Sequence, residues 1–272
     1  MGVSTLHQLN PRLVICSLSG FGRSGAWAER PGYDFVVQGM SGMMAATGPK
    51  DGEPYKFGVA IADIVTGQYA AIAVLAALRS RAASGEGCAV ELALIDCAVA
   101  TMANVGQSYL VTGNAPMRQG NAHAQIAPYQ TFATQDGWII LAIGNDQQWK
   151  RFCNAVDRPD LAKDQRFLTN QGRVQLRDVL VPLVANVIAT RTTADWIREL
   201  QEVQVPCGPI WDLPTLIKSD LATQRRFVVK ARRPDGSEVE LLRSPLVPDP
   251  PLLRSPPDLG GDRATVLAEW LG

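Results

Sequence analysis

One carboxylate stands alone in the segment FGVAIADIVTGQYAAIAVLAAL at residues 57–78, where Asp63 is the only charged residue. Aspartate is a common cap at the start of a helix, and Asp63 stands where a helix is predicted to begin. An ionised carboxylate, with a pKa near ~3.9, can also act as a covalent nucleophile without a general base. The small neighbours Gly58, Ala60 and Ala62 would let a bulky substrate approach. The pattern alone leaves both roles open, and the two roles do not exclude each other.

Two other motifs point to chemistry that their surroundings do not support. GFGRSG at residues 20–25 has the glycine spacing of a dinucleotide-binding loop, but Pro31 and Gly32 interrupt the long helix that should follow. We therefore expect a loop whose backbone approaches some other ligand. A Ser-His-Asp hydrolase usually has a G-x-S-x-G motif, which the sequence lacks, and His123 is the only plausible histidine for it.

The composition indicates a soluble, intracellular, enzyme-like protein. The 272 residues carry 26 Lys and Arg against 26 Asp and Glu, so no basic excess suggests a nucleic-acid partner. The longest uninterrupted apolar run, residues 70–78, is far shorter than the ~18 residues of a membrane span. The five cysteines stand singly without a CxxC pair, which argues against a zinc site and indicates reduced thiols.

The elements that must position these residues alternate between strands and helices in the first part of the chain, which predicts an α/β fold. The pattern predicts a strand at 12–19, a helix at 64–83, a strand and then a helix within 89–110, hairpins at 128–145 and 230–242, helices within 146–204, a proline-rich extended strap at 245–261 and a closing helix at 262–272.

Three ordered blocks resemble the class III CoA-transferases, also called the CaiB/BaiF family. They are LVICSLSGFGRSGAWAERPGYDFVVQGMSGMMAATG, GVAIADIVTGQYAAIAVLAALRSRAASGEG and RQGNAHAQIAPYQTFATQDGWIILAIGN, and the likeness runs from about Pro11 to the C-terminus. The resemblance implies what remains of a Rossmann-like large domain with the nucleophile at 1–115, a linker and smaller α+β domain at 116–240, and a strap and helix at 241–272. It also implies an interlocked homodimer and a cytoplasmic location, with a mitochondrial location left open.

The same resemblance assigns the chemistry. Asp63 matches the family's nucleophile, which attacks an acyl-CoA thioester and becomes an aspartyl-CoA thioester before a second acid takes the CoA. Coenzyme A is then a substrate, and no permanently bound cofactor, metal, nucleic acid or membrane is expected. The α-methylacyl-CoA racemases of the same superfamily carry a histidine thirty positions before the Asp, where this chain has Tyr33 (63 minus 33). Because a phenol with a pKa near ~10 is a poor base but a good donor, Tyr33 favours transfer over racemisation.

The resemblance further suggests binding residues. Arg30, Gly20 and Gly22 are expected on the CoA side of the site, and the acid side is expected to use Arg118, Asn121, His123 and Gln125. The sequence AHAQIAP stands where oxalate-using formyl-CoA transferases have a run of glycines, which favours members that use succinyl-CoA and dicarboxylic acids.

Family members begin with a long N-terminal segment that supplies strands and part of the CoA pocket. Since the likeness here starts at about Pro11, we expect either a shortened gene product or a second chain that supplies this part. Two alternatives to a transferase stay open: a racemase-like enzyme of the same superfamily, and a non-catalytic protein that binds acyl-CoA or acts as a scaffold, left inactive without that segment.

Overall fold

The computed structural model describes residues 2–233, 235–246 and 253–271. The chain separates into two compact units, Met1–Cys207 and Gly208–Gly272. Mixed helices and strands make up both units, in agreement with the predicted α/β class.

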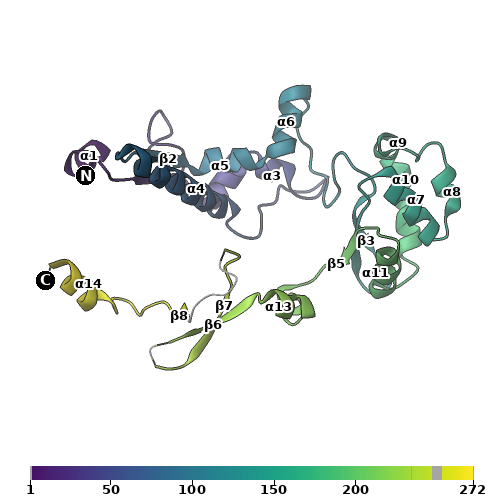
Figure 1. Cartoon of the computed structure of the whole chain (residues 1–272). Coiled ribbons are helices and arrows are strands. Elements are labelled where there is room, and N and C mark those ends of the chain that lie inside the picture. The colour runs from purple at the N-terminus through teal and green to yellow at the C-terminus, as the bar shows by residue number, and fades with distance from the viewer. Residues whose placement is uncertain (1, 234, 247–252, 272) are drawn as a thin grey trace. The chain divides into compact units, whose positions relative to one another are not determined.

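The first unit begins with elements built around a parallel strand pair. These elements are α1 (Val3–Leu9), β1 (Ile15–Ser19), α2 (Asp34–Met40), α3 (Met43–Ala46), α4 (Ile61–Ser84), β2 (Ala89–Ala93), α5 (Leu94–Thr101) and α6 (Ala103–Thr112). β1 pairs with β2 in parallel, with Ile15 opposite Ala89. In Figure 1, α4 runs alongside β2 and α5, which it contacts. A small core joins α2, α4 and α5 through Val37, Ala62 and Ala98, all at most 1% exposed.

Helix α4 starts three residues earlier than the sequence predicted and ends one residue later, at Ser84. Gly85 adopts a left-handed conformation at its C-terminal end, where a residue without a Cβ has no steric cost. By length and composition α4 is also apolar enough to cross a membrane, the one such helix among the described residues. The prediction that no segment is long enough to span a membrane considered only uninterrupted apolar runs. Thr66, Gly67 and Gln68 interrupt the apolar sequence of α4, but the helix as a whole stays apolar. Composition of this kind is also found in helices that pack inside proteins, so it does not by itself imply a membrane.

The remainder of the first unit is a helical layer packed on a small sheet. β3 (Tyr129–Ala133) and β4 (Trp138–Ala142) form the predicted hairpin, and β5 (Cys207–Pro209) joins the sheet beside β4. The helices are α7 (Asp146–Ala155), α8 (Pro159–Lys163), α9 (Asn170–Gln175), α10 (Arg177–Ile188) and α11 (Thr193–Glu202). Their common core includes Trp149 and Trp196, each at most 1% exposed.

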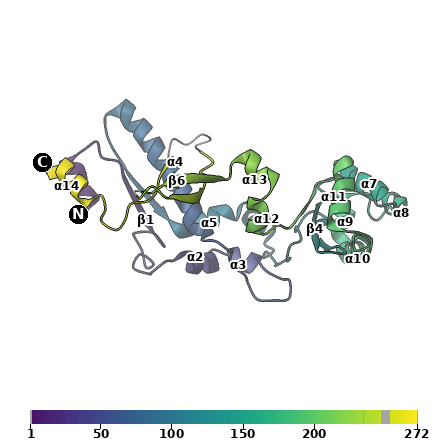
Figure 2. The same cartoon turned by 90° about the horizontal axis from the view of Figure 1, so that it is seen from below.

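The second unit contains the other predicted hairpin. α12 (Leu213–Ile217) and α13 (Asp220–Arg225) precede β6 (Val228–Arg232), as can be followed in Figure 2. β7 (Glu238–Leu242) pairs antiparallel with β6, and β8 (Leu253–Arg254) pairs with β6 in parallel. α14 (Arg263–Leu271) is the predicted closing helix. Residues 247–252 of the predicted proline-rich strap lie outside the described residues.

Candidate active site

Asp63 lies in the first turn of α4, but it does not cap the helix. The residue before the helix, Ala60, has no side chain that could accept a hydrogen bond. Instead Asp34 of α2 accepts the backbone N–H of Ala62 through Oδ1 at 2.8 Å. The Asp63 side chain is exposed, and no hydrogen bond or ion pair involves its carboxylate within the described part of the chain. The interpretation of Asp63 as the cap is therefore wrong, because Asp34, which lies 29 residues earlier (63 minus 34), takes the capping role.

Tyr33 lies at the start of α2, immediately before Asp34. It occupies the N-cap position of that helix with extended backbone angles, and its side chain is 79% exposed. Asp34 and Ala62 are joined by a hydrogen bond, and each is the chain neighbour of one predicted catalytic residue. The structure thus links the starts of α2 and α4, which carry Tyr33 and Asp63.

The glycine loop after β1 is shaped by close backbone packing. A Cβ placed on Gly20 would lie 2.7 Å from the Cα of Gly32, so glycine is needed there whether or not a ligand binds. Gly22 has a φ of +90°, and a Cβ built on it would meet no atom within 4 Å. Arg30 lies over the ring of Trp27, with its guanidinium carbon 3.8 Å from the ring centroid. Arg30 is exposed, and the ring face of Trp27 holds its guanidinium. CoA binding by Gly20, Gly22 and Arg30 remains a prediction.

Two of the four residues predicted on the acid side make structural contacts. The Arg118 guanidinium donates to the backbone carbonyls of Pro49 and Gly52, at 3.2 and 2.8 Å, and so holds that loop. The Asn121 amide donates to Oγ1 of Thr131 at 3.2 Å. Neither residue lines the pocket described next.

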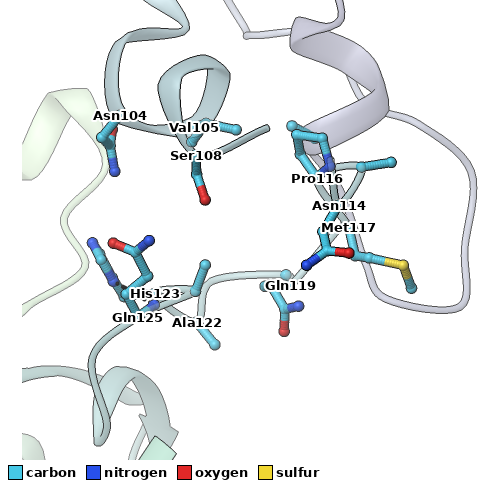
Figure 3. A pocket seen from close by; sticks show the side chains of 14 residues that line it. Asn104, Val105, Ser108, Asn114, Pro116, Met117, Gln119, Ala122, His123 and Gln125 are labelled. Atoms are coloured by element: carbon cyan, nitrogen blue, oxygen red, sulfur yellow. Dashed lines mark hydrogen bonds between the residues drawn. The ribbon is translucent and has the colours of Figure 1, made fainter. Parts of the chain in front are cut away.

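The other two, His123 and Gln125, line a pocket of about 500 Å³. Figure 3 shows Asn104 and Ser108 of α6 across the pocket from them. Nδ1 of His123 accepts the backbone N–H of Gln125 at 3.0 Å, so a neutral ring carries its proton on Nε2. The pocket lining has no Asp, Glu, Lys or Arg. It therefore offers neutral amide, hydroxyl and imidazole groups, which suit hydrogen bonding to an amide or a carboxylate.

The loop that carries His123 and Gln125 is anchored from the helical layer. Arg177 donates to the carbonyl of His123 at 2.6 Å, and burial lowers the pKa of this arginine from its usual value. Asn170 donates to the carbonyl of Gln125 at 2.8 Å, and Arg173 donates to that of Ala127 at 2.8 Å. A loop held by three side chains keeps its pocket-lining groups in a fixed arrangement.

The sequence analysis missed several pocket residues. Asn104, Ser108, Asn114 and Gln119 contribute polar groups to the lining. Their spacing matches no motif, and an amide on an exposed helix carries no local signal of a pocket. Within the described ranges no three His, Cys, Asp or Glu side chains are grouped so as to hold a metal ion.

Solved structures share the fold of this chain over most of its length. A CAIB/BAIF family protein from Brucella suis is 40% identical with a TM-score of 0.83, and the match covers 99% of this chain and 71% of that one. Rv3272 from M. tuberculosis is 26% identical with a TM-score of 0.79, and the match covers 90% of this chain and 65% of that one. The fold is therefore that of a CaiB/BaiF protein, as predicted.

Sequence comparison gives the family directly. The model of CoA-transferase family III matches residues 1–263, so the chain belongs to that family. A succinate–glutarate CoA-transferase of Agrobacterium fabrum is 39% identical over 97% of this chain and 67% of its own length. A succinyl-CoA:glutarate CoA-transferase of Mus musculus is 33% identical over 89% of this chain and 55% of its own length. The chain thus spans between about half and two thirds of these relatives.

Proposed function

We propose that this chain carries the nucleophile of an enzyme that transfers CoA from an acyl-CoA to a carboxylic acid. The observation that carries the proposal is the carboxylate of Asp63, which is exposed and has no bonding partner although it lies at a helix start where capping is expected. A carboxylate relieved of capping by Asp34 is available to attack a substrate. The names of the relatives favour succinyl-CoA as the donor and a dicarboxylic acid such as glutarate as the acceptor.

The reaction is a sequence of four acyl transfers. An Asp63 oxygen attacks the thioester carbon, the C–S bond breaks, and an acyl–aspartyl anhydride and CoA thiolate form. The thiolate attacks the Asp63 carbonyl, which releases the donor acid and leaves an aspartyl-CoA thioester. The acceptor carboxylate then attacks this thioester, giving a second anhydride and the thiolate. Finally the thiolate attacks the acceptor carbonyl, which yields the new acyl-CoA and restores Asp63. No electron or proton is gained or lost overall.

Each step develops negative charge on a carbonyl oxygen, which donors near the start of α4 would stabilise. The partial positive charge of a helix N-terminus favours such charge. Tyr33 is proposed as a hydrogen-bond donor to the reacting groups, because its hydroxyl lies on an exposed side chain at the linked start of α2.

The pocket beside His123 and Gln125 is proposed to bind the acid. The Nε2–H of the His123 ring and the side-chain amide of Gln125 are donors that suit a carboxylate. We further propose a cytoplasmic homodimer. Sedimentation of the chain should give a dimer, and a monodisperse monomer would count against it.

The test of the function is Asp63→Asn with Asp96→Asn as a matched control. Asp96 occupies the same position in the first turn of α5 and is also exposed. Each substitution removes one favourable charge at a helix start, so each should cost at most about 1 kcal/mol of stability. After incubation with succinyl-CoA and then hydroxylamine, peptide mass spectrometry should find a hydroxamate on Asp63 in wild type and in Asp96→Asn. It should find none in Asp63→Asn, and a modification at any other residue would refute the mechanism.

A further inference from the structure

The segment that leads into Asp63 is held at both ends by side chains of α2. At one end, the backbone N–H of Phe57 donates to Oε1 of Gln38 at 2.8 Å. At the other end, the N–H of Ala62 donates to Oδ1 of Asp34 at 2.8 Å. Gln38 and Asp34 are themselves joined, because Nε2 of Gln38 donates to Oδ2 of Asp34 at 2.7 Å. Residues 57–62 are therefore fixed to one pair of side chains one turn apart on α2.

Burial makes this arrangement rigid. Gln38 is 1% exposed, one of the few polar side chains buried in the described part of the chain, and its neighbour Val37 is fully buried. Ala62 is 1% exposed and packs in the same small core. Gln38 and Ala62 lie away from water, whereas Asp34 is half-buried and Phe57 is exposed. A change that leaves the buried amide of Gln38 without a partner is therefore the costly one. The peptide immediately before Asp63 cannot shift without breaking the network.

We propose that Asp34 and Gln38 are positioning residues for Asp63, and that their network sets where its carboxylate meets the substrate. This inference rests on the proposed function, in which Asp63 is the nucleophile. Neither residue touches the reacting atoms in this scheme. They act through the backbone of Phe57 and Ala62, and they fix the start of α2, where Tyr33 lies, relative to the start of α4.

The direction of each hydrogen bond gives a specific test. The two backbone groups at the ends are N–H donors, so Asp34 must accept from Ala62 and Gln38 must accept from Phe57. Only one arrangement then remains for the bond between the two side chains, with the amide donating to the carboxylate. Asp34→Asn places an NH₂ group against the amide of Gln38. Gln38→Glu places a carboxylate against that of Asp34. Each single variant therefore breaks the network.

The double variant Asp34→Asn with Gln38→Glu should restore the network with reversed polarity. The introduced amide can accept from Ala62 and donate to the introduced carboxylate, which in turn accepts from Phe57. A residue with a general role in packing would show no such rescue, because the two single changes would simply add. Asp96→Asn serves as the control, since it changes an exposed aspartate at a helix start outside the network.

Two measurements are made on wild type, both single variants, the double variant and the control. Hydrogen–deuterium exchange of the peptide that contains residues 57–63 reports the network itself, without any substrate. The rate of hydroxylamine-trapped labelling of Asp63 by succinyl-CoA reports the placement of the nucleophile. Both single variants should exchange faster and label roughly tenfold to a hundredfold more slowly, because a displacement of about 1 Å can cost about a hundredfold. The double variant should return both readouts toward wild type.

The outcomes separate this inference from the function on which it rests. No label in wild type refutes the proposed function, and the positioning role falls with it. If wild type is labelled, unchanged exchange in the single variants or unchanged labelling rates in them refutes the positioning role alone. If either single variant does not fold, a double variant that remains as impaired as the singles also refutes it.

Discussion

Arg173 should be the arginine whose loss costs the first unit most stability. Its side chain is fully buried, and its guanidinium donates to the carbonyls of Ala127 and Phe167 at 2.8 and 2.9 Å and to Asp146 at 2.8 Å. Burial lowers the pKa of Arg173 from its usual value, and Asp146 opposes that shift. In Arg173→Met the two carbonyls lose their partners in a dry interior. Each unpartnered acceptor costs about 1–3 kcal/mol, so the loss should total roughly 2–6 kcal/mol.

Asp146 adds little to this cost, because its side chain is 49% exposed and water can replace the lost partner. Arg158→Met is the matched control. Arg158 makes a two-point ion pair with Asp160, but both side chains are partly exposed, at 34% and 60%. Exposed ion pairs contribute little to stability, so this variant should stay close to wild type.

Urea unfolding followed by tryptophan fluorescence measures the difference. Trp149 and Trp196 are buried in the core between the small sheet and the helical layer of the first unit, so their emission should shift to the red when this core unfolds. The urea midpoint of Arg173→Met should fall well below that of Arg158→Met with a similar m-value. If the two variants unfold within about 1 kcal/mol of each other, the reasoning about buried unpartnered carbonyls is wrong.

Two further predictions concern titration and reactivity. Hydrogen bonds from Thr193 lower the pKa of Asp136 in the folded chain, so the ionised carboxylate stabilises the fold. Because the unfolded chain binds a proton more readily, this stabilisation is lost as the pH falls below about 4. The urea midpoint of the wild type should drop over that pH range, and the midpoint of Asp136→Asn should drop less steeply. Equal slopes in the two proteins would refute the prediction. Burial raises the pKa of Cys153 to about 12, whereas Cys88 is exposed. Iodoacetamide at pH 8 should label Cys88 in the folded protein and Cys153 only in urea; equal labelling rates would contradict it.

Local sequence signals predicted much of the fold. The hairpin of β3 and β4 and that of β6 and β7 were both predicted, because Asp-Gly at 136–137 and 235–236 stands between strand-like runs. Helix α2 was not predicted, since Pro31 and Gly32 indicated only a break. β5 was also missed, because Pro206 precedes this strand of three residues and Pro209 is its last residue.

Local sequence signals identify only part of the candidate site. Asp63 was singled out because it is a lone charge, which is visible in the sequence. Asp34, which caps the helix that carries Asp63, was not singled out. The hydrogen bond from Ala62 to Asp34 joins residues 28 apart and forms only when α2 packs on α4. His123 and Gln125 came from a resemblance, and the structure adds Asn104 and Ser108 of α6 to the same pocket. Contacts between distant segments decide these cases, and periodicity does not encode them.

The pairing of β1 with β2 bears on how quickly the chain reaches its native state. Ile15 lies opposite Ala89, so the partners are 74 residues apart (89 minus 15), whereas Tyr129 and Ala142 in the β3–β4 hairpin are 13 apart (142 minus 129). Contacts between distant residues form slowly, because a long loop must close before they are gained. The hairpin and its helical layer are therefore expected to form first. Apolar side chains of α4 such as Ile72 and Leu75 are exposed in the folded chain as well, so the yield of refolding should fall as protein concentration rises.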